Sequence, residues 1–590
     1  MLNSSTDSIE KVIGVLEFCL GSFTKQMIRQ IKTLVALIAI LATGVGADAQ
    51  QLTDDRATLK QLQPALESIR ADKILDHIKV LASDEFEGRG PGARGERLTV
   101  DYLIDQFKRS GLKPGNPDGT FVQKVPLIGS LTTPEIGFEA GGKTMSLKFL
   151  DDFVHEVPAL RPSASLKNAD VVFAGYGIVA PEYGWDDYKG VDVRNKLVIV
   201  LSGEPSQPDK NDPKKLDAKF FKGDTRTYHS TREAKYELAE IRGAAGVLVV
   251  YDPQKARTYS VFQTFAKMEG FSLIPSHSRS APLVFGLMTI GSARRILSLA
   301  GQDFDKLEAE ASRSDRTAVL LNAKANISVK SKIRSVISRN VVARVEGSDP
   351  KLKDEYVIYS AHWDHLGKDT NLVGDQIYNG AQDNAVGSAQ LLEVARGFAR
   401  LARKPKRSIL FIAVTAEEKG FLGSRYYAKH PLFPVAKTVA NINLDGGNVW
   451  GVTADLITTG YGLSTLDEFL AEAARLQGRK FINESIDNGG LYFGSDQIEF
   501  AKVGIAACFP FSGSEYIGRP KDWGDKNWEA YSQERYHQVS DEVKLDWDLS
   551  GAAEDAKWLL ITGYNVAQSV KPPEWKAGSE FKALVERAKK

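Results

Sequence analysis

Two adjacent carboxylates, Glu417 and Glu418, follow an apolar run at residues 408–414 and precede Gly420. The run is rich in β-branched and aromatic residues and shows no alternation, which is typical of a strand buried on both faces of a sheet. In open α/β sheets, reactive groups lie just beyond the C-terminal ends of the strands. The pair is therefore a candidate for proton transfer or metal binding, although such a pair taken alone is also typical of a solvated acidic turn.

Three other predicted strands, at 356–361, 438–444 and 503–508, also lead toward acids or imidazoles. A helix is predicted over 385–401, and Asp383 lies just before its first residue. In chain order, the side chains that follow these strands are His362, Asp364, His365, Asp383, Asp445, His537 and Asp541. Because the carboxyl ends of parallel strands meet at one edge of a sheet, we expect these groups to converge there.

Imidazoles and carboxylates converging at one edge suit two zinc ions. Zinc takes nitrogen and oxygen ligands and, in reactive sites, keeps one position open for water. Two ions about 3.5–4 Å apart need a carboxylate that can bridge them. A ligating histidine commonly donates its other N–H to a carboxylate, and we expect Asp364 to do this for His362 and Asp541 for His537. His365 is interpreted as a hydrogen-bonded orienting side chain rather than a ligand.

These motifs resemble the co-catalytic dizinc aminopeptidase family, which includes glutamate carboxypeptidase and the transferrin receptor. The resemblance rests on the segments at 362–367, 379–385, 415–424 and 536–537. Segments at 174–177, 188–193 and 243–248 are similar to the protease-associated insert domain of many members, and 81–89 is similar to the family's N-terminal region. The resemblance covers nearly all of the chain after residue 49.

The resemblance implies one zinc held by His362, Asp383 and Asp445. It implies a second zinc held by Asp383, Glu418 and His537, so that Asp383 bridges the two Zn2+ ions. Glu417 would be the general base and acid, and Asp364 would orient His362. This division is chemically reasonable, because a carboxylate that ligates zinc has its lone pairs committed, whereas its uncoordinated neighbour is free to move a proton.

One departure from the family pattern is Ser495-Asp496-Gln497, where many relatives have histidine at the third position. That histidine is not a ligand in the pattern, so we expect little loss of metal affinity. The long loop at 511–535, rich in tryptophan, tyrosine and charge, bears on the substrate pocket rather than on the chemistry.

Composition narrows the classes of function. The 590 residues carry a formal net charge of +1 and are 43% hydrophobic, which gives no basic excess to favour a nucleic-acid partner. The two cysteines, Cys19 and Cys508, offer neither a disulfide framework nor a cysteine zinc cluster. Any metal must then be held by histidine, aspartate and glutamate.

An export signal is predicted near the N-terminus. Residues 27–32 are basic, 33–46 are apolar, and 47–49 give a small-x-small cleavage pattern. The apolar stretch is short for a bilayer span, so we expect no stable span after signal removal and a periplasmic or extracellular location, or a membrane anchor if the signal stays uncleaved. Residues 1–26 are interpreted as an over-extended start.

The fold class expected is α/β, with a mixed, largely parallel central sheet flanked by helices and a smaller inserted protease-associated α/β domain. The predicted organisation is 1–26 over-extended start, 27–49 signal peptide, 50–150 N-terminal part of the peptidase domain, 151–325 insert, 326–575 zinc peptidase domain and 576–590 tail.

The function expected is an exported zinc aminopeptidase acting on peptides. A carboxypeptidase or dipeptidase on the same scaffold is an alternative, because Arg519 and Arg535 could bind a C-terminal carboxylate. A glutaminyl cyclase-like transferase and a non-catalytic receptor-like protein are further alternatives. Against the receptor, every ligand position and Glu417 are filled. The oligomeric state stays open.

Overall fold

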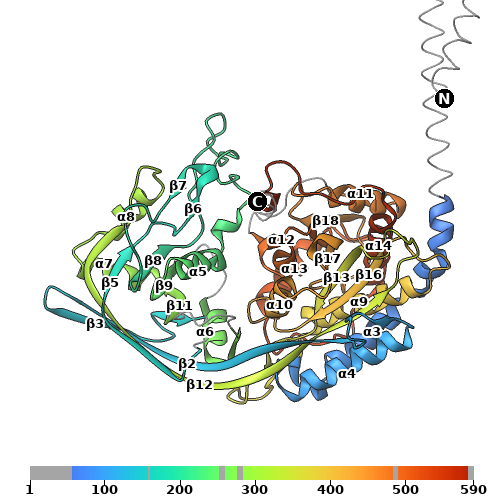
Figure 1. The fold of residues 1–590 in the computed structure, drawn as a ribbon, viewed down its shortest axis with the longest axis horizontal. Helices are drawn as coiled ribbons and strands as arrows, with labels where there is room; N and C mark the ends of the chain where they lie inside the picture. Colours follow the sequence, from blue (N-terminus) through green and yellow to red (C-terminus); the bar gives the residue numbers. More distant parts are fainter. Residues whose placement is uncertain (1–55, 157–159, 252–258, 275–282, 483–489, 583–590) are drawn as a thin grey trace, which may run out of the picture. The chain divides into compact units, whose positions relative to one another are not determined.

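The computed structural model describes residues 56–156, 160–251, 259–274, 283–482 and 490–582 (Figure 1). Contacts divide the chain into two compact units, Met1–Gln63 and Pro64–Lys590. Of the first unit, residues 56–63 are described and are helical. The predicted signal at 27–49 and the preceding residues lie outside the described part. All that follows concerns the second unit.

The expected mixed α/β architecture is confirmed. Four strands of the central sheet run parallel, in the spatial order β20-β17-β13-β16, and the neighbours at both ends, β18 and β12, are antiparallel to them. The strands of this part are β12 (Val319–Val345), β13 (Tyr356–His362), β16 (Ser408–Val414), β17 (Thr438–Asn443), β18 (Asp455–Thr459), β19 (Lys480–Phe481) and β20 (Ala507–Ser512).

Register aligns the ends of β13 and β16. The pairing runs from Tyr356 opposite Ser408 to His362 opposite Val414, and every residue of both strands is buried. Fully burying a large apolar side chain contributes about 1.5–3 kcal/mol, so these apolar strands are strongly held in the middle of the sheet. The loops after His362 and Val414 therefore leave the sheet side by side.

Helices cover both faces of this sheet. On one face, Tyr359 and Phe411 stack on each other and contact Phe398, and Phe107 also packs against Phe411. The helices on this face include α4 (Arg94–Arg109) and α9 (Val386–Ala399); α3 (Ala71–Leu81) and α14 (Ser550–Gln568) lie against α9.

On the opposite face, alternate residues such as Ile358 and Ile412 share a core with Tyr427 and Phe500. These two aromatic residues belong to the short helices α10 (Leu422–Lys429) and α12 (Gln497–Lys502). Period-two alternation thus sends consecutive residues of each strand into two different cores.

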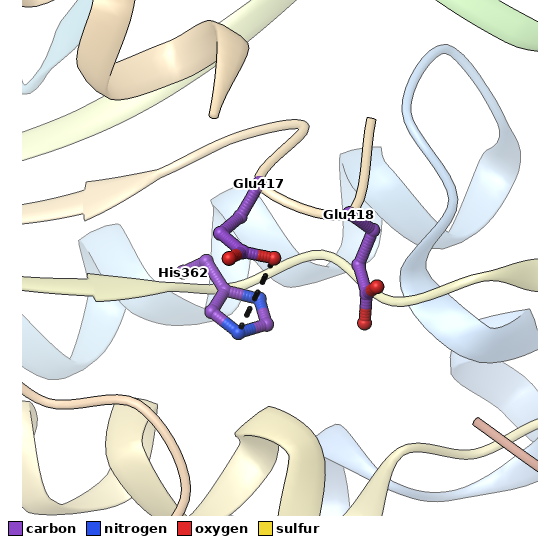
Figure 2. A group of neighbouring side chains, drawn as sticks. All are labelled: His362, Glu417 and Glu418. Atoms are coloured by element: carbon purple, nitrogen blue, oxygen red, sulfur yellow. Dashed lines mark ion pairs between the residues drawn. The ribbon is translucent and has the colours of Figure 1, made fainter. Parts of the chain in front are cut away.

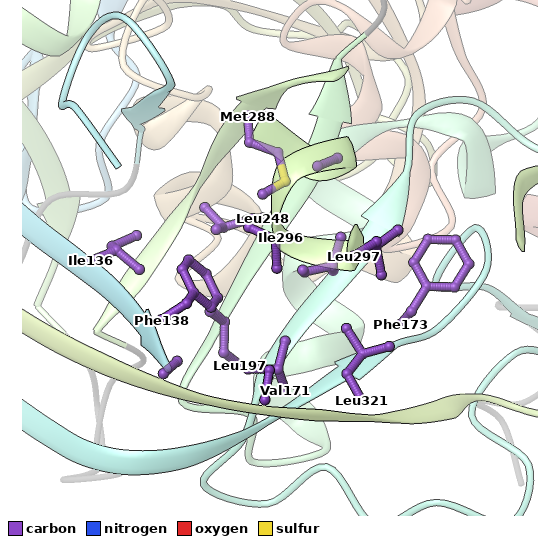
Figure 3. Packing of buried hydrophobic residues seen from close by; sticks show 14 of the residues in the cluster. Ile136, Phe138, Val171, Phe173, Leu197, Leu248, Met288, Ile296, Leu297 and Leu321 are labelled. Atoms are coloured by element: carbon purple, nitrogen blue, oxygen red, sulfur yellow. The ribbon is translucent and has the colours of Figure 1, made fainter. Parts of the chain in front are cut away.

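A second portion of the sheet continues from β12. Its strands, in spatial order from β12, are β5 (Ser163–Phe173), β8 (Leu197–Leu201), β9 (Gly246–Tyr251), β11 (Val284–Thr289) and β4 (Phe153–His155). Its helices are α5 (Arg232–Ile241), α6 (Tyr259–Lys267), α7 (Ile290–Leu299) and α8 (Phe304–Ala311). One core of this portion joins these strands to α7, as Figure 3 shows for Val171, Leu197, Leu248 and Ile296.

The long strand β12 links the two portions, because it pairs with β16 through residues 341–345 and with β5 through residues 319–330. It also pairs with β2 (Val122–Ala140) over residues 324–341. The boundary predicted between residues 325 and 326 falls inside this strand. The strand predicted at 503–508 begins later, at Ala507, because α12 is followed by a turn at Gly504, whose φ is +95°.

Among the described residues, no helix combines the length and the apolar character that crossing a bilayer requires.

Candidate active site

Every acid and imidazole singled out from the sequence lies in the described part, and five elements bring the main ones together. His362 ends β13, Asp445 follows β17, and Asp383 lies in the irregular turn η4 (Ala381–Ala385) that precedes α9. The pair at 417–418 follows β16. His537 comes after α13 (Trp523–Glu534), two residues beyond the aromatic-rich segment 511–535.

One group of ligand-type atoms centres on His362. Its Nε2 lies 3.0 Å from Asp445 Oδ1 and 3.3 Å from Asp383 Oδ1. One ligand atom from each of these residues falls within 4.8 Å of the others, close enough to hold one metal ion. This is one of the ligand sets that the family resemblance implies.

A second group centres on His537. Its Nε2 lies 3.1 Å from Asp383 Oδ2 and 3.2 Å from Glu418 Oε2. The two carboxylate oxygens of Asp383 thus face different imidazoles, Oδ1 toward His362 and Oδ2 toward His537. A carboxylate in this position is shaped to bridge two cations.

His365 belongs to the same cluster. Its Nδ1 lies 2.6 Å from Glu418 Oε1, as expected for an orienting hydrogen bond, and 3.9 Å from Asp383 Oδ2. It also forms a possible ligand set with Asp383 and Glu418. The side chain is fully buried, so it is part of the inner lining of the site.

The two adjacent glutamates have different surroundings. Glu418 is paired with the two imidazoles of His365 and His537, whereas Glu417 approaches His362 at 3.9 Å without hydrogen-bonding to it. Figure 2 shows the two carboxylates pointing to different places, with that of Glu417 beside the His362 ring. Ala416 has a φ of +53°, so the backbone turns sharply where the strand ends.

The electrostatics follow the same division. Burial would raise the pKa of Glu418, but the His537 and His365 imidazoles outweigh it and hold that pKa at about 2. Burial raises the pKa of Glu417 well above its usual value. The negative charges of Asp445 and Glu418 raise this pKa further, whereas the charge of His362 opposes the rise. Glu418 is therefore held as an anion, and Glu417 is the carboxyl of the pair that favours a proton.

The expected orienting contacts are only partly present. The His362 Nδ1 lies 3.1 Å from the backbone carbonyl of Asp364, while the Asp364 carboxylate lies 3.9 Å away and accepts from the Glu417 backbone N–H. The expected Asp541–His537 pair does not form among the described residues. Asp541 instead accepts from the backbone N–H groups of Gln382 and Asp383, so it fixes the turn that carries an acid of the cluster.

The His537 ring meets carboxylates through Nε2 and is otherwise held by aromatic packing. Its Nδ1 is buried and has no hydrogen-bond partner among the described residues. Tyr536 stacks on the ring at 3.8 Å between centroids, and Phe265 of α6 meets it edge to face at 5.3 Å. Sequence reasoning missed Phe265, because it lies in a segment with no chemical motif and 272 residues earlier than its partner.

The departure at Ser495-Asp496-Gln497 lies outside the cluster. Gln497 accepts from Asn443 and donates to the Tyr492 carbonyl. Asp496 accepts from the Ser424 hydroxyl, and burial raises its pKa to about 7. The missing histidine therefore removes no group from the two sets of ligand-type atoms described above.

The donor set fits divalent cations such as zinc. Three imidazoles and four carboxylates, those of Asp383, Glu417, Glu418 and Asp445, are connected by imidazole–carboxylate distances of 2.6 to 3.9 Å. When the imidazoles are neutral, as a ligating histidine must be, the carboxylates leave a strong excess of negative charge. Nitrogen and oxygen donors in this proportion are those that zinc takes in reactive sites.

Comparisons with known proteins agree with this chemistry. Residues 340–561 match the model of peptidase family M28. Aminopeptidase YwaD of Bacillus subtilis (strain 168) is 27% identical over 241 residues, covering 39% of this chain and 48% of that protein. Aminopeptidase NAALADL1 of Mus musculus is 33% identical over 129 residues, covering 21% and 15%. The matches thus span about half or less of these curated relatives.

Among solved structures, an aminopeptidase from Aneurinibacillus sp. strain AM-1 is similar, with a TM-score of 0.47 and 19% identity, covering 87% of this chain and 97% of the other. A zinc aminopeptidase from Bacillus subtilis has a TM-score of 0.40 and 16% identity, covering 84% and 95%. The resemblance stated from the motifs is confirmed by the family match, which includes the whole cluster of acids and imidazoles. Over residues 340–561, the segment that carries the candidate site, the chain matches peptidase family M28.

Proposed function

We propose that the chain is a zinc-dependent aminopeptidase that removes N-terminal residues from peptides. The observation that carries the proposal is the position of Asp383, whose two oxygens are divided between His362 and His537 at 3.3 and 3.1 Å. A bridging carboxylate flanked by two ligand sets is what a two-ion hydrolase needs. The two curated relatives described above are both named aminopeptidases.

Two zinc ions would be held by the implied sets. His362 and Asp445 would hold one ion, Glu418 and His537 the other, and Asp383 both. Bound zinc supplies Lewis acidity, which polarises a peptide carbonyl and makes a water molecule more acidic. The alternative ligand His365 would then act through its hydrogen bond to Glu418, which holds that carboxylate in place.

Glu417 is the proposed general base and acid. It lies beside the cluster, and no described residue forms a hydrogen bond with its carboxylate, so it would be free to take a proton from the attacking water. It would then return the proton to the leaving amine as the peptide bond breaks. Its backbone N–H donates to Asp364 at 3.1 Å, so Asp364 would position the base rather than the His362 ring.

The surrounding organisation is part of the proposal. Residues 151–325 would be a protease-associated insert in a peptidase domain formed by 50–150 and 326–575. The segment at 27–49 would direct export to the periplasm or the cell exterior.

A carboxypeptidase or dipeptidase is the second candidate, and one observation favours it. Arg535, two residues before His537, has a buried Nη1 without a hydrogen-bond partner among the described residues. Such a donor suits a peptide carboxylate. Arg519 instead stacks over the Trp523 ring at 4.8 Å and is exposed.

Peptides with free or blocked termini distinguish the candidates. An aminopeptidase should cleave peptides with a free N-terminus whether or not the C-terminus is amidated, and should lose activity when the N-terminus is acetylated. Cleavage that requires a free C-terminus instead would support the second candidate. Activity that persists after zinc has been removed by a chelator would contradict both.

A further inference from the structure

Arg89 is a buried arginine whose guanidinium is bound by backbone carbonyls. Its Nε donates to Trp363 O at 2.7 Å, and its Nη2 donates to Gly380 O at 2.8 Å. Its Nη1 donates to Asn379 O at 2.6 Å and to Leu81 O at 2.7 Å. The side chain is 1% exposed, and within the described residues its hydrogen bonds all go to carbonyl oxygens.

Three of the four carbonyls, those of Trp363, Asn379 and Gly380, belong to two loops of the candidate site. Trp363 directly follows His362, and Gly380 lies three residues before Asp383. One planar guanidinium therefore connects the loop after β13 to the turn that precedes α9. The donors of arginine form a rigid fork, so the hydrogen bonds set the distance between these loops as well as holding them together.

The local backbone is shaped to bring this side chain inward. Glu87, Gly88 and Arg89 have successive φ values of 48°, 62° and 53°, a left-handed run that is costly for residues with side chains. A Cβ at Gly88 would lie 2.4 Å from the carbonyl oxygens of both Gly367 and Tyr378. The turn therefore packs directly against the pair of short strands β14 (Gly367–Lys368) and β15 (Ile377–Tyr378), which lies between the two loops, and only glycine fits there.

The charge of Arg89 also faces the acids of the site. Burial lowers its pKa to about 10, and the nearby carboxylates of Asp364, Asp383 and Asp541 oppose that effect. The guanidinium therefore stays charged at neutral pH, and it lies behind the cluster rather than among the ligand-type atoms.

We propose that Arg89 is a positioning residue for the metal centre, which holds His362 and Asp383 at the spacing that zinc requires by binding the carbonyls of Trp363, Asn379 and Gly380. The inference rests on the proposed zinc function. It adds that zinc affinity depends on a residue outside the family-matched segment, with no contact to the metal.

Arg89→Lys tests whether the forked donors of the guanidinium are needed. Lysine keeps the positive charge but cannot reach the same carbonyls together. The matched control is Arg407→Lys. Arg407 is equally buried and donates to Ser569 O at 2.6 Å and to Glu355 at 2.8 Å. It precedes β16, so it lies one strand length, about 20 Å, from the end that carries the site. Zinc affinity is measured by competition with a chelator, and metal-free unfolding is measured in parallel.

We expect Arg89→Lys to bind zinc about 10- to 100-fold more weakly than the unchanged chain, as substitutions behind metal ligands commonly do. Arg407→Lys should lose stability while keeping zinc affinity. Equal zinc affinity in Arg89→Lys and the unchanged chain would overturn the inference, whereas no zinc binding by the unchanged chain would overturn the proposed function.

If Arg89→Lys does not fold, Asn379→Ala gives the second test. The Asn379 side chain donates to Ala82 O and Asp84, both at 2.9 Å, and so ties the turn before α9 to the segment that carries Arg89. It should weaken zinc binding in the same direction, and unchanged affinity in this variant would count against the inference.

Discussion

Glu417→Gln separates proton transfer from metal binding. Glutamine has the same size and keeps one oxygen acceptor, but it cannot take a proton. Within the described residues the substitution breaks no close side-chain contact, because the Glu417 carboxylate stays 3.9 Å from the His362 ring. Folding and metal binding should therefore be retained.

The expected loss is kinetic. General acid–base groups contribute about 10²- to 10⁴-fold to rate, which corresponds to about 3–5 kcal/mol at roughly 1.4 kcal/mol per factor of ten. The value of kcat on a free-amine peptide should fall by that factor, and KM should change little, because Glu417 is assigned to the reacting water rather than to substrate binding.

The neighbouring variant Glu418→Gln is the control. It removes one charged partner from His365 at 2.6 Å and from His537 at 3.2 Å, so it should lose zinc as well as activity. Zinc per chain and kcat are measured on both variants. Turnover of Glu417→Gln within about tenfold of the unchanged enzyme, at full zinc content, would remove the base from Glu417, since such a loss is too small for a general base.

The remaining predictions concern metal and pH. Asp383→Asn should lower the zinc content at both positions together, because one amide cannot present two anionic oxygens; elemental analysis that shows only one ion lost would argue against bridging. Zinc at about 100 times its dissociation constant should raise the free energy of unfolding by about 2.7 kcal/mol for each ion bound, and identical denaturation curves with and without chelator would contradict this. Burial lowers the pKa of His155 to about 4, so the unfolded chain binds more protons between that value and about 6.5, and stability should fall by about 2 kcal/mol as the pH drops from 6.5 to 5. His155→Gln should reduce this slope in acid denaturation, and an unchanged slope would show that other groups cause it.

Local sequence determined the central strands well. The apolar run at 408–414 is β16 with the same bounds, because a strand buried on both faces needs continuous apolar residues and leaves little choice of register. The length of β12 was not predicted, since residues 319–337 alternate with polar side chains and only their pairing with β2 and β5 shows that they form one strand.

The types of residue in the candidate site were also readable from the sequence. Acids and imidazoles that follow strands must meet at one sheet edge once the strands are parallel, and the structure brings His362, Asp383, Glu418, Asp445 and His537 together there. Spacing along the chain could not show which oxygen faces which ring, because that depends on side-chain direction after each turn.

Only the tertiary structure decided the contacts behind the cluster. Asp541 binds the backbone at Asp383 rather than the ring of His537, and Phe265 packs on that ring from a distant helix. Arg89 connects two loops more than 270 residues later in the chain. Such contacts join residues far apart in sequence, and burial makes their hydrogen bonds and packing strong without leaving any periodic pattern in the sequence itself.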